Sequence, residues 1–190
     1  MFPRLSERNV RQGFLTDAQY TRLAAECGAE GLWLRALLEV AYTYGWRIGE
    51  LKAMRVSQVD LRTRTIRLEP GTTKNQDGRT VVMTDAVREL LANCVQGKTT
   101  NNYMFTRKDG SSVGDFRKLW AKVCIASGNG KVVCERCSEP VTGPKCERCD
   151  SARLKYVGLI VHDLRRTAAR FRDRDRRPRL AERFPRRNYG

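Results

Sequence analysis

An apolar segment at residues 30–44 places the strongest constraint on how this chain can fold. Its apolar side chains cover most of the circumference of a helix rather than one side: Leu32, Trp33, Leu34, Leu37, Leu38, Val40 and Ala41. A helix of this kind has almost no face left for water, so other elements must surround it. The sequence therefore predicts a central, buried helix against which the rest of the chain packs.

The segments around this helix alternate between helical and strand patterns. Thr16 and Gln19 have capping-box spacing, which predicts a helix that begins directly after Thr16 and that Gly28 should end. Further helices are expected near residues 47–54, 85–95, 113–127 and 162–170. Residues 65–69 and 79–83 alternate like half-buried strands, and the turn-rich link between them predicts a β-hairpin. The fold class is therefore α+β, mostly helical, with a small antiparallel β-sheet.

The chain carries a large excess of basic residues. Its 190 residues include 37 Lys and Arg against 21 Asp and Glu, which gives a formal net charge of +16 and a pI near 10.1. This excess favours a polyanionic partner, because each Lys or Arg set against a phosphate releases condensed counterions. Nucleic acid is the first such partner, and a membrane surface or the ribosome comes next.

The N-terminus and the hydropathy pattern indicate in which cellular compartment we expect the protein. No apolar run reaches the roughly 18 residues that a transmembrane helix needs, so we expect no membrane partner. Residues 1–8 lack the apolar core of a signal peptide. We therefore expect a cytoplasmic protein whose thiols stay reduced.

Three separated segments carry residues suited to one reaction. They are Gly-Trp-Arg-Ile-Gly-Glu-Leu at 45–51, Thr-Lys at 73–74 in the hairpin link, and His-Asp-Leu-Arg-Arg-Thr-Ala at 162–168. Their order and composition resemble the active site of the tyrosine site-specific recombinases, the phage integrase family. The resemblance covers roughly residues 14–170, apart from a cysteine-containing segment.

This resemblance implies an active site formed by four residues: Arg47, Lys74, His162 and Arg165. Lys74 would protonate the leaving 5′ oxygen, and Glu50 would support Arg47 from the same helical face. Members of the family cut and rejoin double-stranded DNA through a 3′-phosphotyrosyl link, and they do so as homo-oligomers on paired sites. The resemblance implies no cofactor for the catalysis.

Elementary chemistry agrees with these roles. Transfer at a phosphodiester passes through five-coordinate phosphorus, with negative charge on two non-bridging oxygens. Arg47 and Arg165 can hold these oxygens without a metal, because Arg donates bidentately and keeps its proton. His162 lies on the same helical face as Arg165, where it can share the phosphate oxygens or shuttle a proton. Alone, each residue has an ordinary interpretation as a surface charge, so the hypothesis depends on the joint pattern.

The two ends of the chain depart from the family pattern. In the family, a second His or Trp and then the nucleophilic Tyr follow the His-x-x-Arg motif, whereas here only Tyr189 follows, in an Arg-rich segment without helical period. We do not expect Tyr189 to be the nucleophile, and an altered reading frame after Arg170 is one hypothesis. The expected division is a leader or linker remnant at 1–13, a catalytic domain at 14–170 and an irregular tail at 171–190.

A short insertion at 130–152 brings four cysteines together in the sequence. Two Cys-x-x-Cys pairs stand eight residues apart: Cys134, Cys137, Cys146 and Cys149. This spacing predicts a tetrahedral Cys₄ zinc knuckle whose four ligands make the Zn²⁺ structural, and disulfides are the alternative. The knuckle would brace the approach to His162, or touch DNA through Lys131, Arg136, Lys145 and Arg148. The other three cysteines are expected in the core: Cys27, Cys94 and Cys124.

Three functions compete on this evidence. The first is a recombinase that performs site-specific DNA recombination or integration, with activity impaired in this chain. The second is a catalytically inactive DNA-binding remnant that keeps the phosphate-gripping arginines. The third, a zinc-finger regulator, leaves Arg47, Lys74 and His162 unexplained.

Overall fold

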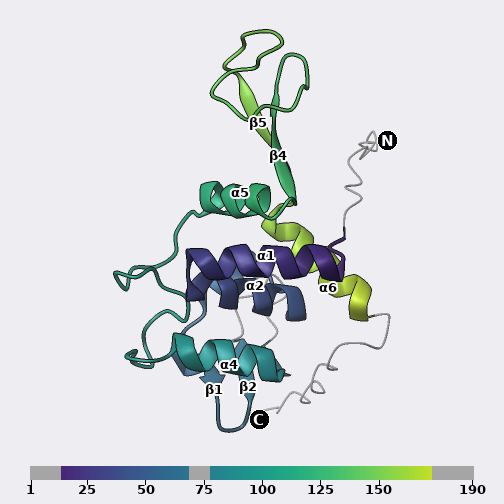
Figure 1. The fold of residues 1–190 in the computed structure, drawn as a ribbon. Coiled ribbons are helices and arrows are strands. Elements are labelled where there is room, and N and C mark those ends of the chain that lie inside the picture. The colour runs from purple at the N-terminus through teal and green to yellow at the C-terminus, as the bar shows by residue number, and fades with distance from the viewer. Residues whose placement is uncertain (1–13, 69–77, 173–190) are drawn as a thin grey trace, which may run out of the picture.

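The computed structural model describes residues 14–68 and 78–172 as a helical body with two small antiparallel sheets (Figure 1). The helices are α1 (Asp17–Glu30), α2 (Leu32–Tyr44), α3 (Ile48–Ala53), α4 (Asp85–Cys94), α5 (Arg117–Ala126) and α6 (Val161–Arg172), with a short 3₁₀ turn η1 (Val56–Gln58). The strands are β1 (Val59–Asp60), β2 (Thr65–Leu68), β3 (Arg79–Val82), β4 (Gly130–Cys134) and β5 (Leu154–Gly158). This mostly helical α+β architecture confirms the predicted fold class.

Helix α2 is the centre of the body, as its apolar circumference predicts. It packs against α1, α4 and α6, and most of its residues are buried. The one acidic residue among them, Glu39, is buried in a polar cluster in which it accepts hydrogen bonds from Tyr20 and from Arg35, the latter at 2.7 Å. A buried carboxylate is tolerated when such partners replace water. The cluster therefore fixes α1 against α2.

The predicted boundary of α1 is wrong. The capping box of Thr16 and Gln19 is present, but the helix continues through Gly28 to Glu30 and ends at Gly31, whose φ is 145°. Gly in a helix costs about 1 kcal/mol relative to Ala. Burial of Leu23 and Cys27 on the same helix outweighs that cost. Helix α5 is also shorter than the expected 113–127 and begins only at Arg117.

The predicted hairpin is confirmed in the three-stranded sheet β1-β2-β3. Strands β2 and β3 pair antiparallel with Ile66 opposite Val81, and both of these side chains are buried. The link between the strands, which contains Lys74, lies outside the described residues. Among the described helices, none is long and apolar enough to cross a membrane.

A second hairpin, β4–β5, projects from the helical body and carries the cysteine segment at its far end (Figure 1). Its strands pair antiparallel from Gly130↔Gly158 to Cys134↔Leu154. Its base lies against α5 and leads directly into α6. We call residues 130–158 the arm and residues 134–150 its tip.

Candidate functional site

The turn between α2 and α3 brings the first predicted motif to α6. Gly45 ends α2 in the left-handed conformation, with φ 65°, and Arg47 is the N-cap of α3. Arg165, from the second turn of α6, donates from Nη1 to the carbonyl oxygen of Gly45 at 3.2 Å. The guanidinium of Arg165 therefore lies at the turn that carries Arg47, although 118 residues separate the two arginines in the chain.

Gly45 also allows α6 to approach this closely. A Cβ atom added at Gly45 would lie 2.9 Å from Cβ of Ala168 and 3.5 Å from the carbonyl oxygen of Arg165. The first distance is shorter than real Cβ contacts, so a side chain here would push α6 away. Both the positive φ and the close approach require glycine.

Glu50 holds Arg47 in place. Its carboxylate accepts from the backbone N–H of Arg47 at 2.8 Å and from Nη1 of Arg47 at 3.1 Å. Glu50 itself is buried, whereas 38% of the Arg47 side chain stays exposed. The ion pair thus fixes the guanidinium at the surface, where an anionic ligand can reach it.

His162 is exposed on the first turn of α6, three residues before Arg165. The helix start is fixed by Asp163, which is buried and accepts from the backbone N–H of Ile160 at 3.0 Å. Arg166 also approaches Asp163, at 4.0 Å. Asp163 therefore both caps the helix and pairs with a neighbouring Arg.

Three of the four predicted active-site residues lie in the described part of the chain, and the fold brings them to one corner. Arg165 touches the turn that holds Arg47, and His162 lies about one helical turn from Arg165. Lys74 lies outside the described residues. The catalytic role of each residue stays a prediction, because it depends on a DNA phosphate.

Two sets of contacts that position α6 have no signal in the sequence motifs. The carbonyl oxygen of Leu159 accepts from Trp120 Nε1 at 2.9 Å and from Tyr156 Oη at 2.8 Å, which anchors the base of the arm just before α6. Thr167 Oγ1 accepts from the backbone N–H of Leu15 at 3.2 Å. The one general signal is the residue type, because the N–H of a Trp or the O–H of a Tyr usually finds a polar acceptor when the ring is covered.

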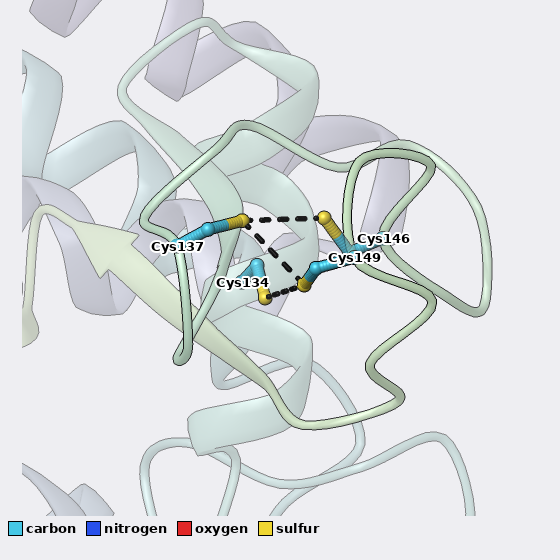
Figure 2. A group of neighbouring side chains, drawn as sticks. All are labelled: Cys134, Cys137, Cys146 and Cys149. Carbon is cyan, nitrogen blue, oxygen red and sulfur yellow. Dashed lines mark hydrogen bonds between the residues drawn. The ribbon is translucent and has the colours of Figure 1, made fainter.

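The second predicted centre is the group of four cysteines at the tip of the arm (Figure 2). All four Sγ atoms lie within 4.8 Å of one another. Neighbouring sulfurs are 3.5 Å apart in the pairs Cys134–Cys149 and Cys137–Cys146, and 3.7 Å apart in Cys137–Cys149. These distances are far longer than a disulfide bond, and the cysteines are free. The cluster can therefore hold a metal ion.

The chemistry of the cluster suits a cation. Backbone N–H groups, chiefly that of Cys137 and also that of Arg136, lower the pKa of the Cys134 thiol to about 6, because they donate to its sulfur. At Cys137 and Cys149 backbone N–H groups act in the same direction, but desolvation and hydrogen bonds with neighbouring sulfurs outweigh them and raise the pKa, so Cys134 is the first of the cluster to ionise. By contrast, burial raises the pKa of the three core thiols, to about 12 for Cys27 and about 11 for Cys94 and Cys124. The core placement of these three cysteines confirms the prediction.

Comparisons with a family model and with solved structures both find integrases and recombinases. The model of the phage integrase family matches residues 13–135. The crystal structure of XerA recombinase superposes with a TM-score of 0.58 at 19% identity, covering 87% of this chain and 52% of that chain. A lambda integrase dimer bound to a COC′ core site gives 0.60 at 19% identity, covering 92% of this chain and 57% of that chain.

The lambda integrase catalytic core matches with a TM-score of 0.56 at 19% identity, covering 87% of this chain and 85% of that chain. The chain therefore spans about half the length of the XerA and DNA-bound lambda integrase chains, and most of the length of the catalytic core. None of the curated proteins compared with the sequence matches it. At these identities the structural likeness shows a shared fold.

Proposed function

Since the chain belongs to the phage integrase family, we propose that it is a tyrosine recombinase domain that cuts and rejoins double-stranded DNA at specific sites. The observation that carries this proposal is the contact of Arg165 with the turn that holds Arg47. Two guanidinium groups near one exposed corner suit a single phosphate. Recombination of this kind integrates or excises a mobile DNA element.

In the proposed reaction a tyrosine Oη attacks the phosphorus, a 3′-phosphotyrosyl bond forms, and the bond to the 5′ oxygen breaks. Arg47 and Arg165 hold the non-bridging oxygens, and Lys74 gives its proton to the leaving 5′ oxygen. His162 shares the phosphate oxygens or shuttles a proton. This sequence needs no cofactor. The nucleophile stays open, because Tyr189 lies outside the described residues.

Structural Zn²⁺ is the metal we propose for the cysteine cluster. Zinc binds thiolates at about 2.3 Å, so the sulfurs of a tetrahedral site lie about 3.8 Å apart. The sulfur separations of 3.5 and 3.7 Å in the cluster are close to that distance. Four protein ligands leave no open position for a substrate, so the ion would stabilise the arm and take no part in DNA cleavage.

Double-stranded DNA is the proposed partner, and copies of the chain are proposed to meet on it. The net charge of +16 supports the first point. The lambda integrase relative is a dimer on its core-site DNA, which supports the second. A DNA substrate and free thiols also favour the cytoplasm as the place of action.

A trapping experiment tests the proposed reaction. The chain first selects duplexes from a random-sequence pool, and these duplexes are then nicked beside each candidate phosphate so that cleavage cannot be reversed. Denaturing electrophoresis should reveal a covalent protein–DNA adduct. Arg165→Ala and Arg47→Ala should each reduce its rate by at least about 100-fold, because each loses a donor to the charged oxygens. Arg88→Ala, which removes an exposed charge on α4, should leave the rate unchanged.

The catalytically inactive DNA-binding remnant is the alternative, and the same experiment separates it. A gel shift without any covalent adduct from the parent chain would favour that function. An adduct that persists in Tyr189→Phe would assign the nucleophile to another tyrosine. No shift and no adduct on any selected or random duplex would contradict the proposed function.

A further inference from the structure

The tip of the arm is placed for contact with something other than its own helical body. Strand β4 contributes five residues, a reach of about 16 Å, before the cysteine cluster begins. Figure 1 shows the tip at the far end of the ribbon, away from the helices. An isolated two-stranded hairpin is marginally stable in water, so the metal-binding cluster gives this projection a fixed shape.

The charge of the tip is opposite to that of the chain. It holds three basic residues, Arg136, Lys145 and Arg148, against four acidic residues, Glu135, Glu139, Glu147 and Asp150. Two ion pairs at 3.4 Å, Arg148–Glu139 and Lys145–Asp150, neutralise two of the bases. Four thiolates with one divalent cation would add two further negative charges. Such a surface is repelled by a phosphate backbone.

The exposed groups of the tip outside these ion pairs include two acids, one base, Arg136, and two prolines. Glu135 and Glu147 are exposed and form no ion pair with any residue that the structure describes. Pro140 and Pro144 are also exposed, in the loop between the Cys-x-x-Cys pairs. A complementary partner therefore offers basic groups around an apolar floor.

The body of the chain carries a hollow with those properties, of about 540 Å³. Trp33, Phe116 and Leu119 line its floor, and the Trp33 and Phe116 rings meet edge to face with centroids 5.7 Å apart. Its rim bears three exposed bases: Arg107, Lys108 and Lys118. We call this site the basic hollow.

The acidic side chains that also line the basic hollow are neutralised locally. Glu30 pairs with Lys122 at 2.6 Å, and Asp115 pairs with Arg117 at 2.6 Å. The three rim bases therefore dominate its potential, and an acidic ligand is attracted to it.

The arm and the basic hollow lie at opposite ends of α5. The hollow uses Phe116 and Leu119 from the first turn, and the arm begins at Gly130, just past the last turn. Because the tip points away from its own body, it meets the hollow of a neighbour rather than its own. Two different surfaces then form the contact, which is the head-to-tail kind that closes rings.

A second hollow, of about 650 Å³, is a poorer acceptor for the tip. It is lined by Tyr156 from the base of the chain's own arm and by Ile160 just after that arm. Of its basic groups, Arg117 is already paired with Asp115, which leaves Lys52. The balance of charge therefore favours the basic hollow.

We propose that the tip of the arm docks into the basic hollow of a second copy of this chain when both copies are bound to DNA. The inference rests on the proposed function, because DNA brings together copies that otherwise repel one another at +16 each. The proposal also bears on the four basic residues that the sequence offered for DNA contact. Arg136, Lys145 and Arg148 stand in the acidic tip, and only Lys131 lies on the strand below it.

Photocrosslinking from the tip tests the contact. A photoreactive amino acid replaces Thr142, which is exposed in the tip, and the chain is irradiated on a mixed-sequence duplex long enough for several copies. We expect a protein–protein adduct on a peptide that contains Lys108 or Lys118. An adduct to DNA, an adduct elsewhere on the protein, or no adduct at all would overturn the proposal.

A charge swap gives an independent measure. Glu135→Lys with Glu147→Lys should lower cooperative binding, taken as the affinity for the long duplex over that for a duplex that fits one copy, by roughly tenfold. Lys108→Glu with Lys118→Glu should do the same, and combining the two pairs should restore cooperativity. Glu89→Lys on α4 makes the same type of charge reversal at one position away from both surfaces and should have no effect. Loss without restoration in the combined variant would contradict the docking.

The failure of the proposed function is distinguishable from failure of this contact. If the chain shifts neither duplex, the proposed function is contradicted. Irradiation of the chain with heparin in place of DNA then still decides the contact, because this polyanion neutralises the repulsion between copies at +16 each: a dimer joined at the basic hollow supports it, and monomer alone overturns it.

Discussion

At the scale of single residues, the candidate site depends on a glycine as much as on its charged groups. Gly45 adopts a left-handed conformation, gives its carbonyl oxygen to Arg165, and leaves room for Ala168. The sequence motifs identified Arg47 and Arg165 by residue type and spacing. They could not identify this contact, because spacing along the chain does not say which backbone carbonyl a distant Arg will reach.

Gly45→Ala should destabilise the fold by about 2 kcal/mol, since Ala is strained at positive φ and its Cβ would overlap Ala168. Denaturant unfolding measures this change. Gly28→Ala is the matched control, because Gly28 lies inside α1 with open space around its Cβ position, and there Ala should stabilise by about 1 kcal/mol. Equal effects of the two substitutions would contradict the close packing of α6.

The core cysteines make a second prediction at this scale. Burial holds the pKa of Cys27 at about 12 and that of Cys94 and Cys124 at about 11, so few of these thiols are ionised at pH 8 and none is accessible. Maleimide labelling followed by mass spectrometry should leave all three unmodified in the native chain and modify them in denaturant. Labelling of any of them as fast as a small free thiol would contradict their placement.

At the scale of elements, the sequence predicted the parts whose signals are local. A capping box located the start of α1, apolar patterns located α2, and the turn-rich link located the β2–β3 hairpin. The strands β4 and β5 were not predicted, because Gly130 and Gly158 at their ends and the cysteine loops between them obscure the alternation. Segments about twenty residues apart pair because of tertiary contacts, and the strand propensity of each segment alone does not predict that pairing.

Metal removal should affect the arm and spare the body. Helix α5 and the Leu159 carbonyl anchor the base of the arm through Trp120 and Tyr156, whereas the tip has the cysteine cluster as its core. Chelation or Cys134→Ser should abolish bound zinc and expose residues 135–153 to limited proteolysis, while helical circular dichroism changes little. Thr142→Ala, in the same tip, should keep its metal.

Full zinc retention by Cys134→Ser, or a proteolytic pattern unchanged by chelation, would show that the cluster does not hold the arm together. Global unfolding on chelation would show that the metal stabilises the helical body as well as the arm.

At the scale of the whole molecule, a basic chain folds so that segments distant in the sequence meet at one corner. The body folds around α2, and that arrangement carries the Gly45 turn onto α6. The sequence predicted the members of the site from a family resemblance, and the fold brings Arg165 onto the turn that holds Arg47, with His162 about one helical turn away. Lys74 stays a prediction outside the described residues.

The central claim is that Arg47 and Arg165 grip one DNA phosphate. A crystal structure of the chain with a duplex that it selects from random-sequence DNA tests this claim most directly. We predict that both guanidinium groups lie about 2.7–2.9 Å from oxygens of the same phosphate, with His162 beside it. Contacts of the two arginines to different phosphates, or DNA bound on another face of the body, would contradict the account.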